Sequence, residues 1–357
     1  MRICYVTHSN SHFTAPYVDY FAARGHEIHV ISFHPNDLPN AVVHHPAGGA
    51  FDPEKHKWRY LWNARKVVRL IQRIKPDILH AHYVTSNGAL AAASGVHPLV
   101  VSARGSDVHT RVRGWFARRL IVYVLQHADL MNPVSRELEE KILDLGCPRG
   151  RVLRLTQGIV VRNFLVDRSR RKPGPIRIIC TRPLSSKYQC DRIARALVVL
   201  AHLRTDWEFT FAATGPREGV LRQRIDRAGL ADHVRFLGGF TQAALPALLA
   251  DSDIYVSASL SDGTSPALLE AMTSGAFPVV SDIPANREWL TGQGDSLFFS
   301  PHNLPQLVQC LMQAIDDGSL RRRAIEMNPP RVQEKGDRET NLSVLAQTYG
   351  RLVERRH

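Results

Sequence analysis

The sequence predicts an α/β protein of two domains, each built around a parallel sheet covered by helices. Apolar, strand-like runs alternate with helical stretches along the chain, and this alternation favours parallel sheets. At 357 residues the chain exceeds one ordinary hydrophobic core and suits two domains of roughly 150 to 180 residues. The alternation stops at Leu165–Pro175, a basic stretch with prolines and no periodicity, and then restarts. We therefore expect an interdomain linker there.

The first predicted domain, residues 1–165, opens with a strand, a helix that ends at Gly25, and a second strand. No Gly-x-Gly-x-x-Gly follows the first strand, so the sequence lacks the fingerprint of nicotinamide and flavin sites. The predicted strands are Arg2–His8, Glu27–Phe33, Asp77–His82, Leu99–Ala103 and Asp129–Val134, and the predicted helix is Ala15–Arg24.

The second predicted domain, residues 176–337, repeats the alternation, and a last helix is expected at Glu339–Arg355. Its predicted strands are Ile176–Cys180, Trp207–Ala213, Val234–Leu237, Ile254–Ala258, Phe277–Val280 and Leu297–Phe299, and its predicted helices are Gln189–Leu203, Val220–Ala228, Ala243–Ala250, Pro266–Ser274 and Leu304–Ile315.

The stretch from Ser252 to Ser281 carries the clearest indication of function. Its buried strand leads through a loop into a short helix, with Thr264 or Ser265 as the N-cap and Pro266 at the first helical position. In a unit of this kind the helix N-terminus lies at the carboxyl end of the sheet, where phosphates bind. The stretch therefore predicts an anion site.

Two carboxylates frame this site: Asp262 in the loop and Glu270 on the helix, eight positions later. A carboxylate accepts hydrogen bonds from sugar hydroxyls, so the combination indicates a nucleotide sugar. The spacing Asp262-x7-Glu270, followed by Ala-Met-x-x-Gly, resembles the Glu-x7-Glu signature of the retaining glycosyltransferases of the GT-B fold, in their family 4. Asp262 replaces the usual Glu, and Pro266 removes one N–H from the segment that faces the donor phosphates in that family.

A second motif in the right order and spacing is Arg182-x4-Lys187, in the loop after the strand Ile176–Cys180. It matches the basic pair that binds the donor diphosphate in this family, although Thr181 replaces the usual Gly before the Arg. A basic pair at such a place offsets the charge that builds on the leaving nucleoside diphosphate. The resemblance covers nearly the whole chain, and these two motifs, in this order and spacing, are its strongest evidence.

The resemblance implies two Rossmann-like domains that face each other across a cleft, with the C-terminal stretch 338–357 crossing back to the first domain. It implies a sugar transfer from a nucleoside-diphosphate sugar to a hydroxyl of a glycan, glycolipid or small molecule, with retention of configuration and no metal or other cofactor. The implied catalytic residues are Arg182, Lys187, Asp262 and Glu270, and the implied donor-binding residues are Gly215, Gly238, Thr264, Ser265, Ala267 and Leu268.

An acceptor site is expected at the carboxyl end of the first sheet. His12 lies in the first loop, His82 ends the fourth strand, and Asp107 follows the fifth. The carboxyl ends of parallel strands meet at one edge, so these groups are expected to converge there. Many family members have a His where this chain has Arg104, and Arg-Gly-Ser-Asp is a variant found in some members.

A metal site is not expected. The literal Asp-x-Asp at Asp251-Ser252-Asp253 precedes a buried strand, which places it at the amino end of the sheet, opposite the predicted site. The five cysteines are scattered and odd in number, which favours a reducing cytoplasm over a disulfide framework or a zinc site. No apolar run approaches the roughly 18 residues of a membrane helix, and no signal-peptide pattern follows Met1.

The net charge of +13 has competing explanations: a nucleotide-diphosphate site, an acidic membrane surface, or nucleic acid. Basic residues alternate with aromatic ones in Lys55–Lys75 and again in Arg111–Arg119. This pattern suits the headgroup layer of an acidic membrane, but it also suits a buried core stripe with a solvated basic back. No nucleic-acid motif is present, so nucleic acid is not an expected partner.

Other functions stay open at the level of sequence. A nucleotide-sugar epimerase or a phosphorylase can use the same two-domain plan, and an epimerase would convert a nucleotide sugar without an acceptor. A non-catalytic, basic membrane-binding relative is the alternative from another class. It would show salt-sensitive binding that does not depend on nucleotide.

Overall fold

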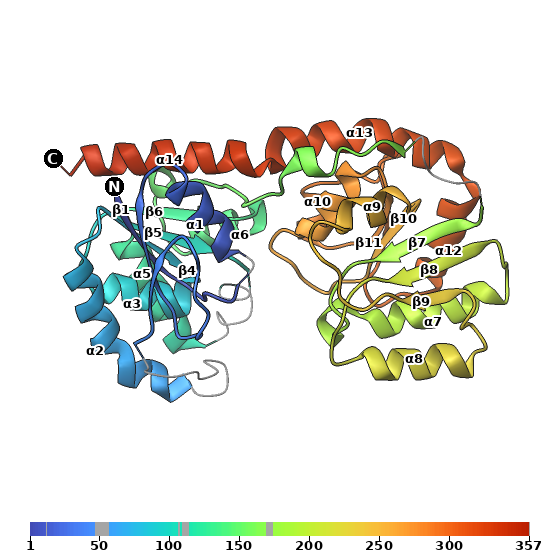
Figure 1. Ribbon diagram of the computed structural model, residues 1–357, viewed down its shortest axis with the longest axis horizontal. Coiled ribbons are helices and arrows are strands. Elements are labelled where there is room, and N and C mark those ends of the chain that lie inside the picture. Colours follow the sequence, from blue (N-terminus) through green and yellow to red (C-terminus); the bar gives the residue numbers. More distant parts are fainter. Residues whose placement is uncertain (12, 47–56, 106–107, 109–113, 169–173, 357) are drawn as a thin grey trace. The chain divides into compact units, whose positions relative to one another are not determined.

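The computed structural model describes residues 1–11, 13–46, 57–105, 108, 114–168 and 174–356. It divides into two compact units, drawn in Figure 1. The first unit comprises Met1–Gln157 and Glu339–His357, and the second comprises Gly158–Arg338. The division at Gln157 precedes the stretch predicted as a linker. Each unit contains a six-stranded sheet in which every pairing is parallel, so the predicted α/β fold class is confirmed.

The first unit has the strand order β3-β2-β1-β4-β5-β6. Its strands are β1 (Arg2–Val6), β2 (Glu27–Ile31), β3 (Val42–His44), β4 (Ile78–His82), β5 (Leu99–Ala103) and β6 (Leu130–Pro133). Its helices are α1 (Thr14–Ala22), α2 (Lys57–Ile74), α3 (Ala89–Ala93), α5 (Trp115–His127), α6 (Arg136–Asp144) and α14 (Arg338–Glu354), with a π-helical turn at Val84–Gly88 and a 3-10 turn at Arg149–Arg151.

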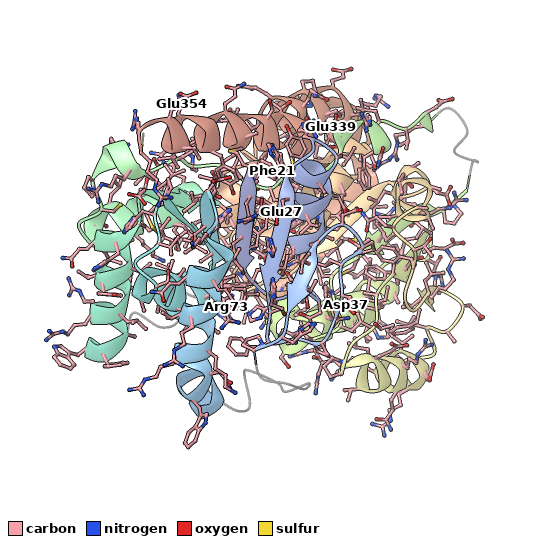
Figure 2. The ribbon with its side chains drawn as sticks, turned by 60° about the vertical axis from the view of Figure 1, so that its left-hand side comes forward. Phe21, Glu27, Asp37, Arg73, Glu339 and Glu354 are labelled. Atoms are coloured by element: carbon pink, nitrogen blue, oxygen red, sulfur yellow. The ribbon has the colours of Figure 1, made fainter. Side chains whose placement is uncertain are left out.

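Helices cover both faces of this sheet. On one face, α2, α3 and α5 share a single apolar cluster, which includes Val67, Leu90 and Val124. On the other face, α1 and α14 pack together, and the ring of Tyr349 stacks on Phe21 at 5.1 Å between centroids. Figure 2 shows Phe21 beside the helix that runs from Glu339 to Glu354. The C-terminal helix is thus part of the core of the first unit.

The second unit has the strand order β12-β11-β10-β7-β8-β9. Its strands are β7 (Ile176–Cys180), β8 (Trp207–Phe211), β9 (Val234–Phe236), β10 (Ile254–Ser257), β11 (Phe277–Ser281) and β12 (Leu297–Phe299). Its helices are α7 (Cys190–Ala201), α8 (Glu218–Arg227), α9 (Leu245–Ala250), α10 (Pro266–Thr273), α11 (Pro284–Arg287), α12 (Leu304–Asp316) and α13 (Gly318–Gly336), with 3-10 turns at Val161–Asn163 and Ser186–Tyr188.

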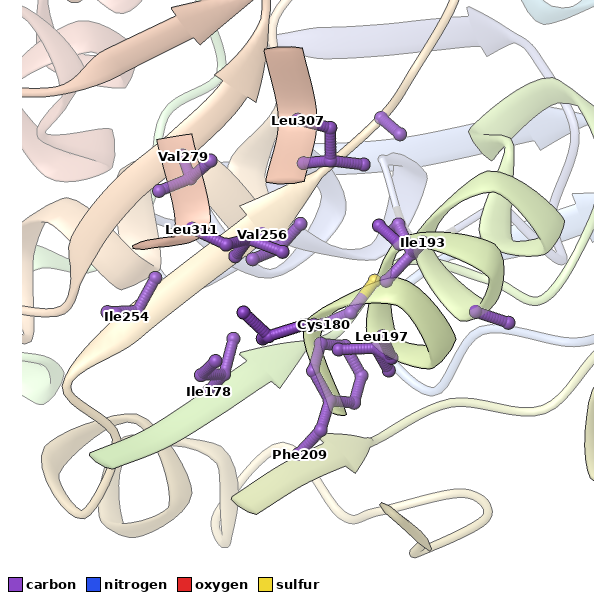
Figure 3. Close-up of a cluster of buried hydrophobic side chains, with 14 of the residues drawn as sticks. Ile178, Cys180, Ile193, Leu197, Phe209, Ile254, Val256, Val279, Leu307 and Leu311 are labelled. Atoms are coloured by element: carbon purple, nitrogen blue, oxygen red, sulfur yellow. The ribbon is translucent and has the colours of Figure 1, made fainter. Parts of the chain in front are cut away.

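The strands of this sheet are apolar because both faces are buried. Successive side chains of a strand point to opposite faces. Ile254 and Val256 therefore join one core cluster, whereas Tyr255 joins the other. Figure 3 shows the first cluster, to which strand residues such as Ile178 and Leu197 of α7 both belong.

Helix α13 is absent from the sequence-based prediction. It contains Pro329 and Pro330, which usually end a helix, so the sequence gives no helical signal there. Tertiary contacts hold it instead: Arg331 donates to the carboxylate of the fully buried Asp295 at 2.7 Å, and Asn328 donates to the Asp295 carbonyl at 3.0 Å. Among the described residues, no helix has the length and apolar character needed to cross a membrane.

Candidate functional site

The second sheet has a switch point between β7 and β10, where the order of the strands reverses. The loops that follow these two strands leave toward opposite sides, and ligands of such sheets bind in the crevice between them. The loop after β7 carries Arg182 and Lys187, and the loop after β10 carries Asp262, Thr264 and Ser265. The two predicted motifs therefore meet at one place.

Arg182 is the centre of this meeting. Its side chain is 7% exposed, and its guanidinium donates to Ser265 Oγ at 2.7 Å and to the two carboxylate oxygens of Asp262 at 2.9 and 2.8 Å. It also lies over the ring of Tyr188, 4.1 Å from the centroid. Its Nε is buried and has no hydrogen-bond partner in the protein. A buried donor without a partner needs an explanation, and an acceptor supplied by a ligand is one.

Lys187 supplies a second cation. It lies in the 3-10 turn Ser186–Tyr188, which is held to the other loop because the amide of Leu260 donates to the Lys187 carbonyl at 3.1 Å. Its ammonium is 4.0 Å from Asp262 Oδ1, and its side chain is half exposed. The site therefore carries two positive groups and one carboxylate at the switch point.

Helix α10 begins at this site. Ser265 is its N-cap, and Pro266 occupies the first turn, where its missing N–H costs nothing. The amide of Leu268 donates to Ser265 Oγ at 3.3 Å and to the Ser265 carbonyl at 3.1 Å. Leu268 is buried in the core, whereas Thr264 and Ala267 are partly exposed beside the cap. Of the predicted donor-binding amides, that of Leu268 is therefore already used by the cap.

Glu270 lies one turn further along α10 and is 8% exposed. Burial raises its pKa to about 7, opposed by a hydrogen bond from Gln242 and by the charges of Arg338 and Arg182. The Gln242 amide donates to Glu270 Oε1 at 3.4 Å. A carboxylate kept out of water is a strong acceptor for hydroxyl groups. Gln242 and Tyr188 are site residues that the sequence prediction missed, because neither lies in a motif.

The two predicted glycines have different structural tasks. A Cβ on Gly215 would lie 2.4 Å from the Leu184 carbonyl oxygen, so only glycine lets the loop after β8 approach the loop that carries Arg182. Gly238, just after β9, has φ +75°, a conformation that favours glycine, and a Cβ there would meet nothing within 4 Å. Gly215 shapes the switch point directly, and Gly238 shapes the chain leaving β9.

In the first unit, two of the three predicted acceptor residues, His12 and Asp107, lie outside the described residues. His82 is 1% exposed, and both its ring nitrogens are bonded. Its Nε2 accepts from Arg104 at 3.3 Å, so its proton is on Nδ1, which donates to Thr7 Oγ at 3.0 Å. Burial and the Arg104 charge hold the pKa of His82 well below its usual range. His82 thus positions Arg104 and does not itself reach the surface.

Arg104 lies at the carboxyl end of β5, at the edge where an acceptor was predicted. It donates to Gln157 at 3.3 Å and lies over the ring of Phe13, 5.0 Å from the centroid. At the end of β4 in the same unit, Tyr83 has a φ of +75°, a strained conformation that often marks a functional site. Its ring is 5.5 Å from that of His8, whose pKa burial and His34 lower to about 4. The sequence prediction missed His8 and Tyr83.

The Asp-x-Asp pair lies at the amino end of β10. Asp251 pairs with Arg177, and Asp253 accepts from the Arg177 amide at 2.9 Å. Within the described ranges, no group of three or more His, Cys, Asp or Glu side chains is placed to hold a metal ion.

Two family models match this chain. Residues 2–133 match "Glycosyl transferase 4-like", and residues 161–329 match "Glycosyl transferases group 1". The curated relatives match over part of their length: an amylovoran biosynthesis glycosyltransferase of Erwinia amylovora is 28% identical over 47% of this chain and 45% of its own. A lipopolysaccharide core biosynthesis mannosyltransferase of Rhizobium meliloti is 31% identical over 36% of this chain and 38% of its own. The chain thus spans less than half of these two relatives.

Among solved structures, HepE of Anabaena in complex with UDP is similar over 99% of this chain and 100% of its own, with a TM-score of 0.79 and 17% identity. That similarity concerns the fold, and the two family models cover most of both units. The chain therefore belongs to the glycosyltransferases of the GT-B fold, in family 4 (glycosyl transferases group 1).

Proposed function

We propose that this chain is a retaining glycosyltransferase that moves a sugar from a nucleoside-diphosphate sugar to a hydroxyl of a glycan, a lipid-linked glycan or a small molecule. One observation carries the proposal: the buried Arg182, with Nε left for a ligand, lies beside Lys187 at the switch point of the second sheet. Two fixed cations at a helix N-terminus suit a diphosphate. Glu270, on the same helix, suits the ribose hydroxyls.

The proposed reaction is a front-face displacement. The bond between the sugar's anomeric carbon and the diphosphate oxygen breaks, and the acceptor oxygen bonds to that carbon on the same face. The acceptor's proton passes to the departing phosphate oxygen. Arg182 and Lys187 stabilise the negative charge that develops on the phosphate. Because these side chains supply positive charge, we propose that the transfer needs no metal ion.

A thermal-shift screen tests the donor site. The purified chain is heated with UDP, GDP, ADP or TDP and their common sugar conjugates, with EDTA or with Mg²⁺. We expect one base to raise the melting temperature equally in both conditions, since a ligand that binds only the folded state stabilises it. Arg182→Ala should reduce the shift. A shift that requires Mg²⁺ contradicts metal independence, and the absence of any shift contradicts the donor site.

We place the protein in the cytoplasm, at an acidic membrane surface. All five cysteines lie in the described residues and are free and buried, which favours a reducing compartment. The proposal of a membrane surface rests on α2 and α5, which contain no acidic residue. Their side chains Trp62, Trp115 and Phe116 are 78%, 72% and 73% exposed.

The basic and aromatic side chains lie on the outer faces of these helices. On α2, Val67, Ile71 and Ile74 face the core, whereas Trp62, Lys66, Arg69 and Arg73 follow one another at helical spacing and are exposed. Both helices cover the same sheet face, and both begin at its carboxyl edge, because they return antiparallel to the strands. A buried core stripe therefore does not explain these aromatic residues, because they are exposed. The positive charge of the same surface favours anionic lipid as its partner.

Vesicle sedimentation tests this surface. The full chain should pellet with vesicles of phosphatidylglycerol and phosphatidylcholine but not with phosphatidylcholine alone. Lys66→Gln with Arg69→Gln should weaken binding by about thirtyfold, given about 1 kcal/mol for each basic residue at an acidic surface. The matched control is Arg224→Gln with Arg227→Gln, two exposed arginines of α8. Equal weakening by both pairs would indicate net charge alone and contradict a defined surface.

A further inference from the structure

We infer that Asp262 is a positioning residue, which orients Arg182 and Lys187 for the donor diphosphate and does not contact the transferred sugar. The inference rests on the proposed function, because it assigns a task within the same donor site. It departs from the expectation from the sequence, in which the carboxylates that frame the site, Asp262 included, accept hydrogen bonds from sugar hydroxyls.

Both oxygens of the Asp262 carboxylate are engaged by the basic side chains of the site. Both its oxygens accept from one terminal nitrogen of Arg182, at 2.9 and 2.8 Å, and Oδ1 lies 4.0 Å from the Lys187 ammonium. Its side chain is 10% exposed, and that of Arg182 is 7% exposed. In the donor-free protein this carboxylate compensates the buried Arg182, and its removal would leave a buried cation unpaired, which is strongly unfavourable.

These contacts fix the orientation of the guanidinium. One terminal nitrogen of Arg182 bonds Ser265 Oγ, the other bonds Asp262, and the ring of Tyr188 lies against the flat face. The remaining edge, at Nε, has no partner in the protein. Asp262 therefore decides which edge of Arg182 is left for phosphate oxygens. A fixed donor of this kind binds the phosphate without first having to be reoriented.

The charge of the site supports the same task. Two cations without a carboxylate would repel each other in the donor-free protein, and Arg182 is buried. Asp262 lies within reach of both and leaves the group with an excess of one positive charge. A residue one methylene longer would place its carboxylate differently, so the aspartate at this position matters to the arrangement.

A double-mutant cycle tests the inference. Equilibrium dialysis measures the dissociation constants of UDP and UDP-glucose, or of the diphosphate and conjugate that the thermal screen selects, for wild type, Asp262→Ala, Arg182→Gln and the double variant. We expect Asp262→Ala to raise both dissociation constants by the same factor, about fivefold or more. Once Arg182 is replaced, the same substitution should have less than about a twofold effect. Asp262→Asn, which keeps the shape of the side chain, should behave like Asp262→Ala.

Two results would overturn the inference. In one, Asp262→Ala weakens the sugar conjugate and leaves the diphosphate unchanged; in the other, the effects of the two substitutions simply multiply. Asp251→Ala is the control, because Asp251 pairs with Arg177 at the opposite end of the sheet and should leave both constants unchanged. If wild type binds no nucleotide, the proposed function fails. The same four proteins unfolded in urea then still report whether Asp262 and Arg182 are coupled, and additive changes there reject the pairing.

Discussion

Gly215→Ala is expected to abolish nucleotide binding and to destabilise the protein by about 2 kcal/mol or more. The new Cβ would lie 2.4 Å from the carbonyl oxygen of Leu184 and 2.7 Å from its carbon and nitrogen. These are backbone atoms, so no side-chain movement relieves the clash. The Leu184 amide donates to Thr214 at 3.0 Å, and the Arg217 amide donates to Leu184 at 2.9 Å. The loop that carries Arg182 must therefore move as a whole.

Gly219→Ala is the matched control for this substitution. Gly219 is exposed in α8, and a Cβ there meets nothing within 4 Å. Alanine in an exposed helix position favours the folded state by up to about 1 kcal/mol over glycine. Urea unfolding and the thermal-shift assay with nucleotide measure both variants. A Gly215→Ala protein with wild-type stability and affinity would show that the close approach of the two loops is not required.

Glu270→Gln is expected to stabilise the protein at pH 8 while it weakens nucleotide binding. Burial raises the pKa of Glu270 from 4.5 to about 7, so the folded state holds this proton at a pH where the unfolded chain has released it. Between pH 4.5 and about 7 the unfolding free energy of wild type therefore falls as the pH rises, and this contribution is constant above that range. The shift corresponds to about 3 kcal/mol, and glutamine removes it.

Nucleotide binding by Glu270→Gln, unlike its stability, should be weaker than that of wild type. A neutral amide replaces a charged acceptor for the ribose hydroxyls, which weakens nucleotide affinity by about tenfold or more. Affinity of wild type for a nucleotide sugar should rise between pH 6 and 8 as Glu270 ionises, and affinity of Glu270→Gln should not. Glu326→Gln, an exposed position of α13, is the control. If the unfolding free energies of Glu270→Gln and wild type keep the same difference at pH 5 and pH 8, the charge of Glu270 is not buried as described.

The local parts of the site were predictable from the sequence because their signals are local. Ser265 as a cap, Pro266 in the first turn and the helix that carries Glu270 all follow from residues within one short stretch. The contact between Arg182 and Asp262 joins residues 80 positions apart, so no periodicity or spacing indicates it. The strands predicted in the first unit also end near the observed ones, because polar residues bound their apolar runs.

Other features depend on tertiary contacts that a pattern does not contain. Helix α13 forms despite two prolines because Asp295 and Arg331 hold it. His82 has the same residue type and strand-end position as a ligand-binding histidine, yet burial and its two bonded nitrogens give it a supporting role. Tyr83, with its positive φ, directly precedes the π-helical turn Val84–Gly88, and no residue type in the sequence marks that turn.

The C-terminal helix gives the chain an order of assembly. Leu342, Leu345 and Tyr349 belong to the core of the first unit, although they are made after the whole second unit. On the ribosome, residues 1–157 therefore emerge without part of their core, and the second unit, whose segment 158–338 is continuous, is the first that can close. A released chain that ends at residue 338 should contain a protease-sensitive first unit and a resistant second unit.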